Sequence, residues 1–190
     1  MRRALPLLLA IILLMSGCAQ TSQPEKKQYT ATFLELFDTV TTVVGKAPDP
    51  DAFTERANQV RDRLTVYHRL FDIYNSYEGL NNLKTVNDQA GIAPVAVDPE
   101  IIALLKDCKA YYELTGGKVN AAMGSVLRLW HEARQNAKLP NAADLANARL
   151  HMDFANVMID KDASTVYISD PEMSLDVGAI AKGWAVQRIA

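Results

Sequence analysis

The sequence predicts a globular protein with helices and strands mixed along one chain. Apolar residues recur at helical spacing over residues 49–71. The pair Asp-Pro, which marks a helix start, occurs at residues 49–50 and again at 98–99. Residues 157–169 have the pattern of two short strands around a polar turn. With 190 residues, 49% hydrophobic and 22% charged, the chain is long enough to bury its own core.

Charge and cysteine content exclude several classes of function. The 20 Lys and Arg residues against 22 Asp and Glu give a net charge of −2, so no nucleic-acid partner is expected. The two cysteines, Cys18 and Cys108, are too few for a disulfide scaffold or a cysteine-built zinc site. Cys108 shares the apolar face of a predicted helix with Ile101, Leu104 and Leu105, so we expect it in the core rather than as a reactive thiol.

The N-terminal segment resembles a bacterial lipoprotein signal. Two arginines precede the apolar run Ala4–Met15, which is shorter than the roughly 18–20 residues that a membrane-spanning helix needs. Two small residues then precede Cys18. This pattern predicts a signal peptide over residues 1–17, a lipid on Cys18 and a polar tether over residues 18–29. We therefore expect an extracytoplasmic protein anchored to a membrane. The alternative is an ordinary signal peptide or anchor with an incidental cysteine.

Residues 30–190 follow the tether and contain the predicted helices and strands. The first predicted elements are a strand at Thr30–Val44 with an irregularity at Asp38, a helix from Asp49 to Phe71, and a loop with a short helix within Asn75–Gly91. Three helices follow: one from Pro99 to the Gly116-Gly117 pair, one from about Ala122 to Ala137 with Met123, Val126, Leu127 and Trp130 facing inward, and a short one at Asn141–Arg149. The last elements are hairpin strands at Val157–Ile159 and Thr165–Ser169, a strand at Ser174–Val177, and a helix that begins at Gly178. No cap or stop signal follows this last helix before Ala190, so we expect the sequence to be part of a longer protein.

Common catalytic signatures are absent from the sequence. It has no GxSxG elbow, no P-loop and no HExxH pair. Its three histidines, His68, His131 and His151, are far apart without ligand spacing, and we expect them on the surface or in packing contacts. Two other segments have residues that suit a ligand.

The first of these segments joins the last predicted strand to the last predicted helix. Asp176 ends the strand, Gly178 makes the turn and Lys182 lies in the first helical turn. Free N–H groups at a helix N-terminus, together with a lysine, suit a phosphate. Asp176 would accept hydrogen bonds from ligand hydroxyls or ring nitrogens. A plain strand–helix junction with a solvated lysine explains the same residues.

The second segment runs from Thr115 to Trp130. Gly116 and Gly117 let the backbone approach a ligand closely, and the Asn120 amide is suited to reading the edge of a heterocycle. Taken alone, the segment is equally well explained as the end of one helix followed by another.

Together and in this order, the two segments resemble the ApbE family of FAD:protein FMN transferases. Asp176–Val186 reads DVGAIAKGWAV and matches the family signature D-[LV]-G-[GA]-I-A-K-G-[YW]-A-V. Gly117–Gly124 stands where the family has G-x-[FV]-[DN]-x-x-x-G. Phe37–Thr39 and Phe71–Gly91 resemble two further family segments in the same order. The resemblance covers roughly residues 33–190.

The resemblance implies a fold and a reaction. For residues 30–190, the fold would be of the α+β class and would form the N-terminal part of a T-fold-related, FAD-binding flavin transferase domain. It would have an antiparallel sheet, helices packed to one side and an exposed sheet edge. The reaction would be Mg²⁺-dependent transfer of the FMN half of FAD to a threonine hydroxyl of an acceptor protein, with release of AMP. In the family, further Mg²⁺ ligands and part of the adenine pocket come from a C-terminal half. We therefore expect residues 1–190 to be inactive on their own.

The resemblance also implies site residues, motif by motif. The implied FAD contacts are Phe37, Tyr74, Lys118, Val119, Asn120, Asp176 and Lys182. The backbone carbonyl of Ala179 is implied as a ligand of Mg²⁺. No catalytic residue is implied by the motifs present.

Three other functions stay open from the sequence. The protein would be an FAD pyrophosphatase if it released FMN and AMP without transfer. It would be a flavin-capturing lipoprotein if it bound FAD without turnover. An anchored solute-binding domain of another kind would not bind flavin at all.

Overall fold

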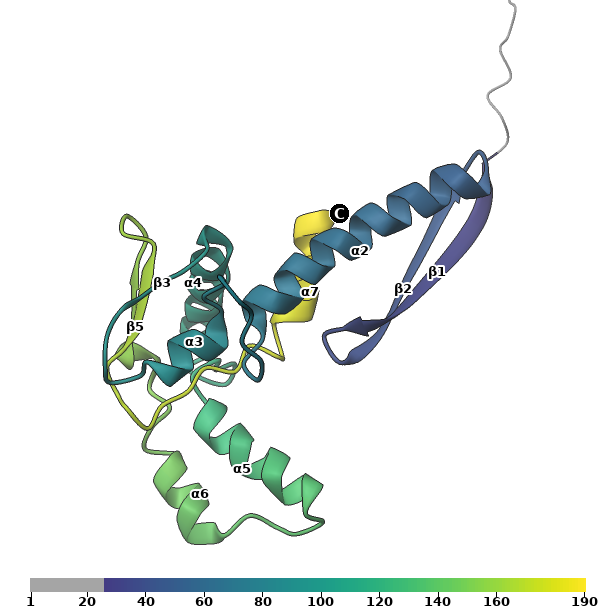
Figure 1. Ribbon diagram of the computed structural model, residues 1–190. Helices are drawn as coiled ribbons and strands as arrows, with labels where there is room; N and C mark the ends of the chain where they lie inside the picture. The colour runs from purple at the N-terminus through teal and green to yellow at the C-terminus, as the bar shows by residue number, and fades with distance from the viewer. Residues whose placement is uncertain (1–25) are drawn as a thin grey trace, which may run out of the picture. The chain divides into compact units, whose positions relative to one another are not determined.

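The structure is a computed structural model that describes residues 26–190 (Figure 1). The predicted signal peptide and Cys18 lie outside the described residues. No helix within the described range is both long and apolar enough to span a membrane. The described chain divides into two compact units, one formed by residues 26–31 and 42–57 and the other by residues 32–41 and 58–190.

Strands β1 (Lys27–Leu36) and β2 (Thr39–Ala47) form a two-stranded sheet whose connection is only two residues long. The prediction of one strand with an irregularity at Asp38 is therefore wrong, because the chain reverses there. Phe37 and Asp38 both have left-handed φ angles, 54° and 51°. This conformation costs a non-glycine residue about 1–2 kcal/mol. The turn was not predicted because the sequence has none of the Gly or Asn-Gly signals usual for such turns. The first residues of β1 belong to the expected tether.

Helix α2 (Pro50–Phe71) confirms the predicted amphipathic helix. The Asp49 side chain caps it by accepting the N–H of Ala52 at 2.8 Å. In the first unit, Phe53 of this helix stacks on Tyr29, with ring centroids 5.5 Å apart. In the second unit, the C-terminal half of α2 supplies four buried side chains to the core.

Four further helices follow at the predicted places. They are α3 (Leu83–Asp88), α4 (Pro99–Leu114), α5 (Gly124–Gln135) and α6 (Ala142–Ala148). Asn82, Asp98 and Asn141 cap three of them through their side-chain oxygens. Helix α4 ends as predicted, because Gly116 and Gly117 take positive φ and donate their N–H groups back into its last turn.

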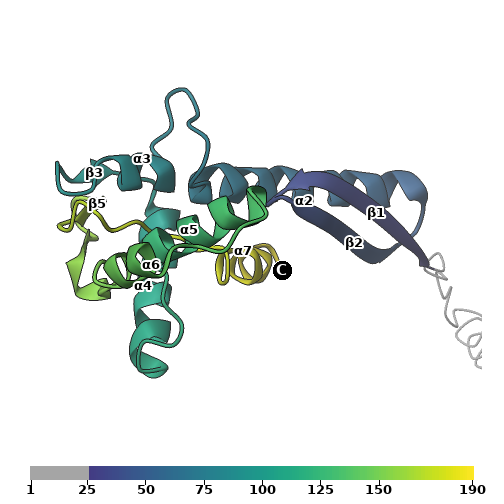
Figure 2. The same ribbon diagram turned by 90° about the horizontal axis from the view of Figure 1, so that it is seen from below.

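Helices α5 and α6 pack side by side (Figures 1 and 2). In α5, Val126 is buried as predicted. Trp130 is 49% exposed, so the prediction that it faces inward is wrong. Helix α5 is strongly amphipathic, and its indole lies outside the narrow buried stripe.

A second sheet has three strands in the order β3 (Val95–Ala96), β5 (Thr165–Ile168) and β4 (Val157–Asp160). Both pairings are antiparallel, which confirms the hairpin and the antiparallel sheet of the α+β class. A 3-10 turn, η1 (Phe154–Asn156), leads into β4. Helix α3 contacts β5 and α4 contacts β4 (Figure 1), so helices cover this sheet.

The strand predicted at Ser174–Val177 does not form. Its backbone is paired outside any ladder: Leu175 exchanges two hydrogen bonds with the Asn87 side chain, at 2.7 and 3.0 Å, and Asp176 N–H donates to a loop carbonyl. Helix α7 (Ala181–Ile189) begins three residues later than predicted. A turn closed on the Val177 carbonyl precedes it.

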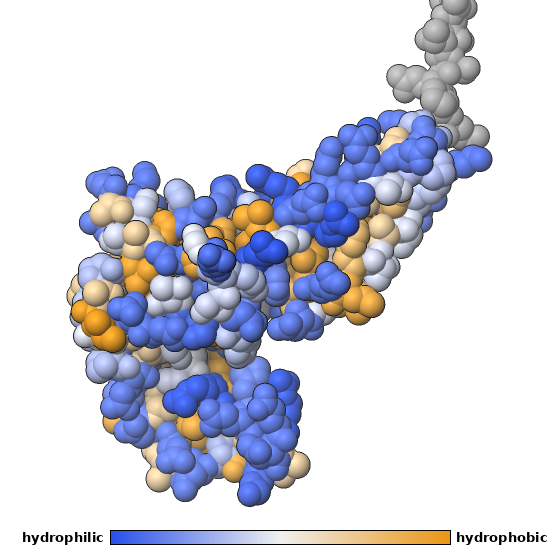
Figure 3. All heavy atoms as spheres, in the orientation of Figure 1, coloured by the Kyte–Doolittle hydropathy of each residue, from blue (hydrophilic) through white to orange (hydrophobic). Residues whose placement is uncertain are grey.

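One hydrophobic core fills the second unit. Its largest fully buried side chains are Phe154, Leu70, Leu83, Ile101, Leu104, Leu105, Ile168 and Leu175. Cys108 lies in this core as predicted, and burial raises the pKa of its thiol to about 12. The outer face seen in Figure 3 is mostly hydrophilic, with apolar residues in small separate groups.

Candidate functional site

A cavity of about 770 Å³ in the second unit gathers most of the predicted site residues. Its walls come from the β1–β2 turn, the end of α2 with the loop after it, α5, and the start of α7. Phe37, Tyr74, Asp176, Ala179 and Lys182 all line it. Residues from four separate parts of the chain are therefore brought to one place.

The β1–β2 turn presents Phe37 to this cavity. The Phe37 N–H donates to Nδ1 of His68 at 3.2 Å, and the two rings meet edge to face at 5.6 Å. Left-handed φ angles at non-glycine residues cost free energy and cluster at functional sites. The turn at Phe37 and Asp38 fits that pattern, because it places an aromatic ring and a carboxylate in the cavity wall.

Asp72 organises the loop that carries Tyr74. It is 8% exposed and accepts hydrogen bonds from the backbone N–H groups of Tyr74 and Asn75, the Asn75 amide and the Tyr77 hydroxyl. Burial by itself would raise the pKa of Asp72, but these hydrogen bonds outweigh it and hold the pKa below its ordinary value. Asp72 therefore stays ionised and keeps the loop closed around its carboxylate.

Tyr74 places its ring in the cavity wall with 56% of the residue exposed. Burial, and then the negative charges of Asp176 and Asp38, raise the pKa of its phenol. The hydroxyl lies 3.3 Å from Nε2 of His131, whose Nδ1 lies 3.1 Å from the Arg134 guanidinium. The phenol is therefore neutral and hydrogen-bonded to α5.

Asp176, Gly178 and Lys182 lie along one wall of the cavity. Asp176 Oδ1 accepts the Gly178 N–H at 2.8 Å and holds the turn before α7. Within the described chain, we find no donor to the second oxygen, Oδ2. Lys182 is exposed in the first turn of α7, where no side chain among residues 26–190 caps the helix. This wall therefore offers a carboxylate oxygen, an ammonium group and a positive helix end.

Helix α7 is fixed by its outer residues. The Trp184 indole donates to the Asp107 carboxylate of α4 at 2.7 Å and meets the rings of Tyr67 and Phe71 edge to face. The Arg188 guanidinium lies over the same indole at 5.2 Å. These contacts set the direction of α7 and so the position of Lys182.

The other predicted contacts, Lys118–Asn120, do not line this cavity. The Asn120 amide donates to the Met152 carbonyl at 2.8 Å, and its oxygen accepts a backbone N–H two residues on. The two family motifs nevertheless meet, because the Ala121 carbonyl accepts the Asp176 N–H at 2.8 Å. The segment around Ala121 thus hydrogen-bonds to the backbone of the cavity wall without lining the cavity.

The described residues contain no group of three or more His, Cys, Asp or Glu side chains arranged to hold a metal ion. Ala179 lies in the cavity wall beside Asp176. In the described chain, the backbone hydrogen bonds of this junction end on Val177 and Ile180 and not on the Ala179 carbonyl. Mg²⁺ commonly keeps several waters and binds through one or two protein oxygens plus substrate phosphates. The cavity therefore suits Mg²⁺ only as a partner of a bound phosphate.

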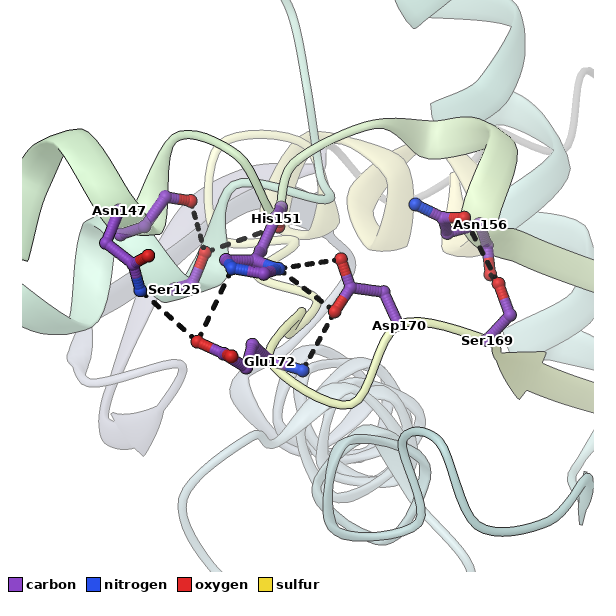
Figure 4. Close-up of polar contacts among 8 residues, drawn as sticks. Ser125, Asn147, His151, Asn156, Ser169, Asp170 and Glu172 are labelled. Carbon is purple, nitrogen blue, oxygen red and sulfur yellow. Dashed lines mark hydrogen bonds and ion pairs between the residues drawn. The ribbon is translucent and has the colours of Figure 1, made fainter.

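A second cavity, of about 610 Å³, lies between α5, α6 and the segment after β5. His151 lies between two carboxylates there, with Nδ1 at 2.8 Å from Asp170 and Nε2 at 3.4 Å from Glu172 (Figure 4). Asn147 donates to Glu172, and the Ser125 hydroxyl donates to backbone carbonyls rather than to the imidazole. The polar side chains of this cluster pair with one another and with backbone carbonyls, and they join α6 to the chain after β5. His151 is thus a packing histidine, as predicted.

Sequence reasoning missed four residues that line the first cavity. His68 and His131 were expected on the surface or in packing contacts, and Asp72 and Arg134 were not singled out. Their roles depend on contacts between segments far apart in the chain. The available signal was proximity to a motif, because His131 and Arg134 lie one and four residues beyond Trp130, where the second segment ends.

Comparison with known proteins points to one family. The ApbE family profile matches residues 37–190. The chain is 37% identical over 112 residues to the FAD:protein FMN transferase of Treponema pallidum, covering 56% of this chain and 31% of that protein. It is 31% identical over 129 residues to the enzyme of the same name from Klebsiella pneumoniae, covering 64% and 40%. The chain thus spans less than half the length of these curated relatives.

Solved structures agree in fold. The ApbE protein of Thermotoga maritima superposes with a TM-score of 0.74 at 24% identity, covering 86% of this chain and 51% of that one. The flavin transferase ApbE of Vibrio cholerae gives a TM-score of 0.71 at 18% identity, covering 87% and 52%. With a family profile that matches most of its length and a fold that agrees, this chain belongs to the ApbE family.

Proposed function

We propose that this chain forms the flavin-binding part of an enzyme that transfers the FMN half of FAD to a threonine hydroxyl of an acceptor protein. Membership of the ApbE family and the names of its curated relatives support flavin transfer. The observation that carries the proposal is the convergence of Phe37, Tyr74, Asp176 and Lys182 on one cavity of about 770 Å³. Such a volume and such a mixture of aromatic and charged groups suit a nucleotide.

Each wall of the cavity has a role in this proposal. Phe37 and Tyr74 present aromatic surface against which an isoalloxazine ring can pack. Lys182, at the uncapped start of α7, attracts the pyrophosphate. Asp176 Oδ2 accepts hydrogen bonds from ligand hydroxyl or N–H groups, while Oδ1 holds the turn.

The reaction breaks one bond and forms one bond. The acceptor threonine oxygen bonds to the FMN-side phosphorus, the bond from that phosphorus to the bridging oxygen breaks, and AMP leaves with the bridging oxygen. The hydroxyl proton passes to solvent. Lys182 holds the phosphates in place while negative charge builds up on them.

The Mg²⁺ requirement is also part of the proposal. The Ala179 carbonyl would hold the ion from the cavity wall, and the bound phosphates would supply further oxygens. When bound, Mg²⁺ would neutralise charge on the pyrophosphate.

Incubation with an acceptor protein tests the proposal. The experiment uses the full natural gene product that contains residues 1–190, referred to below as the full chain, with FAD, Mg²⁺ and an acceptor bearing a flavinylation threonine. We expect the acceptor mass to rise by that of FMN less one water, and we expect AMP to be released. Free FMN with an unmodified acceptor would mean that the enzyme hydrolyses FAD instead of transferring FMN, and would contradict the transfer step. FAD that binds without turnover, or does not bind, would contradict the proposal.

Membrane anchoring through Cys18 is a separate proposal that rests on the N-terminal sequence alone. A bacterial host labelled with a radioactive or clickable fatty acid should label the wild-type protein and not the Cys18→Ser variant. Unchanged labelling and membrane fractionation in the variant would contradict the anchor.

A further inference from the structure

Three side chains form a line of contacts across the wall of the first cavity. Tyr74 comes from the loop after α2, and His131 and Arg134 come from α5. Tyr74 Oη lies 3.3 Å from His131 Nε2, and Arg134 Nη2 lies 3.1 Å from His131 Nδ1. The Tyr74 and His131 rings meet edge to face, with centroids 6.1 Å apart and planes at 82°. All three residues line the cavity.

Donor and acceptor chemistry fixes the direction of both hydrogen bonds. A guanidinium group has only donors, so Nδ1 of His131 must be the acceptor of the Arg134 hydrogen bond. An imidazole with a lone pair on Nδ1 is neutral and carries its proton on Nε2. That Nε2–H therefore donates to the hydroxyl oxygen of Tyr74.

This direction leaves the Tyr74 hydroxyl with its own proton to donate elsewhere. The pKa of the phenol is raised by burial and by the nearby carboxylates of Asp176 and Asp38, so the proton stays on the oxygen at neutral pH. The residue is 56% exposed in the cavity wall, within reach of a ligand. Because the hydroxyl oxygen accepts from His131, the hydroxyl proton is free to be donated to a ligand in the cavity.

We propose that His131, held by Arg134, is a positioning residue that makes Tyr74 donate its hydrogen bond to the bound ligand. The inference rests on the proposed function and deepens it, because it specifies what the ligand presents to Tyr74. That atom must be an acceptor without a proton, such as a carbonyl oxygen or bare nitrogen of the flavin ring, or a phosphate oxygen. A ligand that presents an N–H there leaves two donors facing each other and binds weakly.

A double-mutant cycle on FAD affinity in the full chain tests this coupling. Tyr74→Phe removes the hydroxyl, and His131→Leu removes the donor that orients it. A neutral hydrogen bond contributes about 0.5–1.5 kcal/mol, so each single change should weaken FAD binding roughly two- to tenfold. The double variant should bind FAD as Tyr74→Phe does, because His131 acts through the hydroxyl. Multiplying effects in the double variant, or unchanged affinity in His131→Leu, would overturn the proposal.

Conservative variants and a second flavin complete the affinity measurements. His131→Gln keeps a donor on a side chain of similar reach and should recover most of the affinity lost in His131→Leu. If it binds as weakly as His131→Leu, a hydrogen-bonding role is contradicted. Repeating the cycle with riboflavin, which lacks phosphate, assigns the acceptor to the flavin ring if the coupling persists and to a phosphate oxygen if it disappears.

The tautomer can be measured without any flavin. With ¹⁵N-labelled histidine at mildly alkaline pH, the His131 resonances, assigned from their loss in His131→Gln, should show a protonated Nε2 and a bare Nδ1. Arg134→Met should shift them, and the matched control Arg128→Met, also on α5, should not. A wild-type ring protonated on Nδ1 would overturn the inference. If the full chain binds no flavin, the proposed function fails, and the tautomer alone decides the inference.

Discussion

Replacing Asp72 by asparagine tests how the loop that carries Tyr74 is held. Asp72 Oδ1 accepts two backbone N–H groups at 2.7 and 3.0 Å, and Oδ2 accepts the Asn75 amide at 3.0 Å and the Tyr77 hydroxyl at 2.8 Å. Asparagine keeps one acceptor oxygen but places its NH₂ group against the Asn75 amide, so two donors face each other. Hydrogen bonds to a charged group contribute about 1.5–3 kcal/mol each. Losing one and weakening the others predicts a loss of about 2–4 kcal/mol in the free energy of unfolding.

Urea unfolding of the full chain measures this loss, and Asp62→Asn is the matched control. Asp62 lies on α2 with its side chain 66% exposed and pairs with Arg61 at the surface, so its change should stay within about 0.5 kcal/mol. Because the pKa of folded Asp72 is depressed, its stabilisation is present above about pH 4 and is lost as the pH falls through the folded pKa. The two variants should therefore converge in strong acid. Equal urea midpoints for Asp72→Asn and Asp62→Asn at neutral pH would refute the reasoning.

Three further predictions concern packing and protonation. Gly124→Ala should lower the free energy of unfolding in urea titrations by about 1–3 kcal/mol, because a Cβ there would lie 2.6 Å from a neighbouring carbonyl oxygen. Gly183→Ala, whose Cβ would meet no described atom within 4 Å, should leave the free energy of unfolding unchanged or raise it by up to about 1 kcal/mol. Burial would raise the pKa of Asp170, but hydrogen bonds, the largest from His151, lower it, so the stabilisation from this carboxylate is lost as the pH falls below about 4. The free energy of unfolding of Asp170→Asn should therefore fall less than that of the wild type over that pH range. Native Cys108 should resist alkylation by iodoacetamide until the protein unfolds, because its thiol is buried and its pKa is raised to about 12; rapid labelling of the native protein would place it outside the core.

The helices were predictable because their ends carry local signals. The side chains of Asp98 and Asn141 each accept the N–H of the residue two positions later. The Gly116-Gly117 pair ends α4 through hydrogen bonds to the last turn of that helix. Such interactions are visible in a short stretch of sequence. Element type and order followed from them almost everywhere.

The exceptions depend on partners far away in the chain. The turn at Phe37 has no glycine signal, and its N–H is satisfied by His68, 31 residues later. The segment around Leu175 has a strand-like sequence, but the Asn87 side chain, 88 residues earlier, takes the place of a neighbouring strand. A pattern along the chain does not encode either partner.

The same distinction applies to the site. The family motifs led to Phe37, Tyr74, Asp176 and Lys182, which the fold then gathers in one cavity. His131 belongs to no motif, and its importance arises only because α5 faces the loop that Asp72 holds closed.

FAD affinity of the Lys182→Ala variant of the full chain tests most directly whether this cavity is the flavin site. A charge-assisted hydrogen bond contributes about 1.5–3 kcal/mol, so the dissociation constant should rise roughly ten- to hundredfold. The melting temperature should barely change, because Lys182 is exposed and adds little packing. Lys161→Ala, in the exposed β4–β5 turn, is the matched control and should bind FAD as the wild type does. Equal FAD affinity in the wild type, Lys182→Ala and Lys161→Ala would contradict the assignment of this cavity as the flavin site.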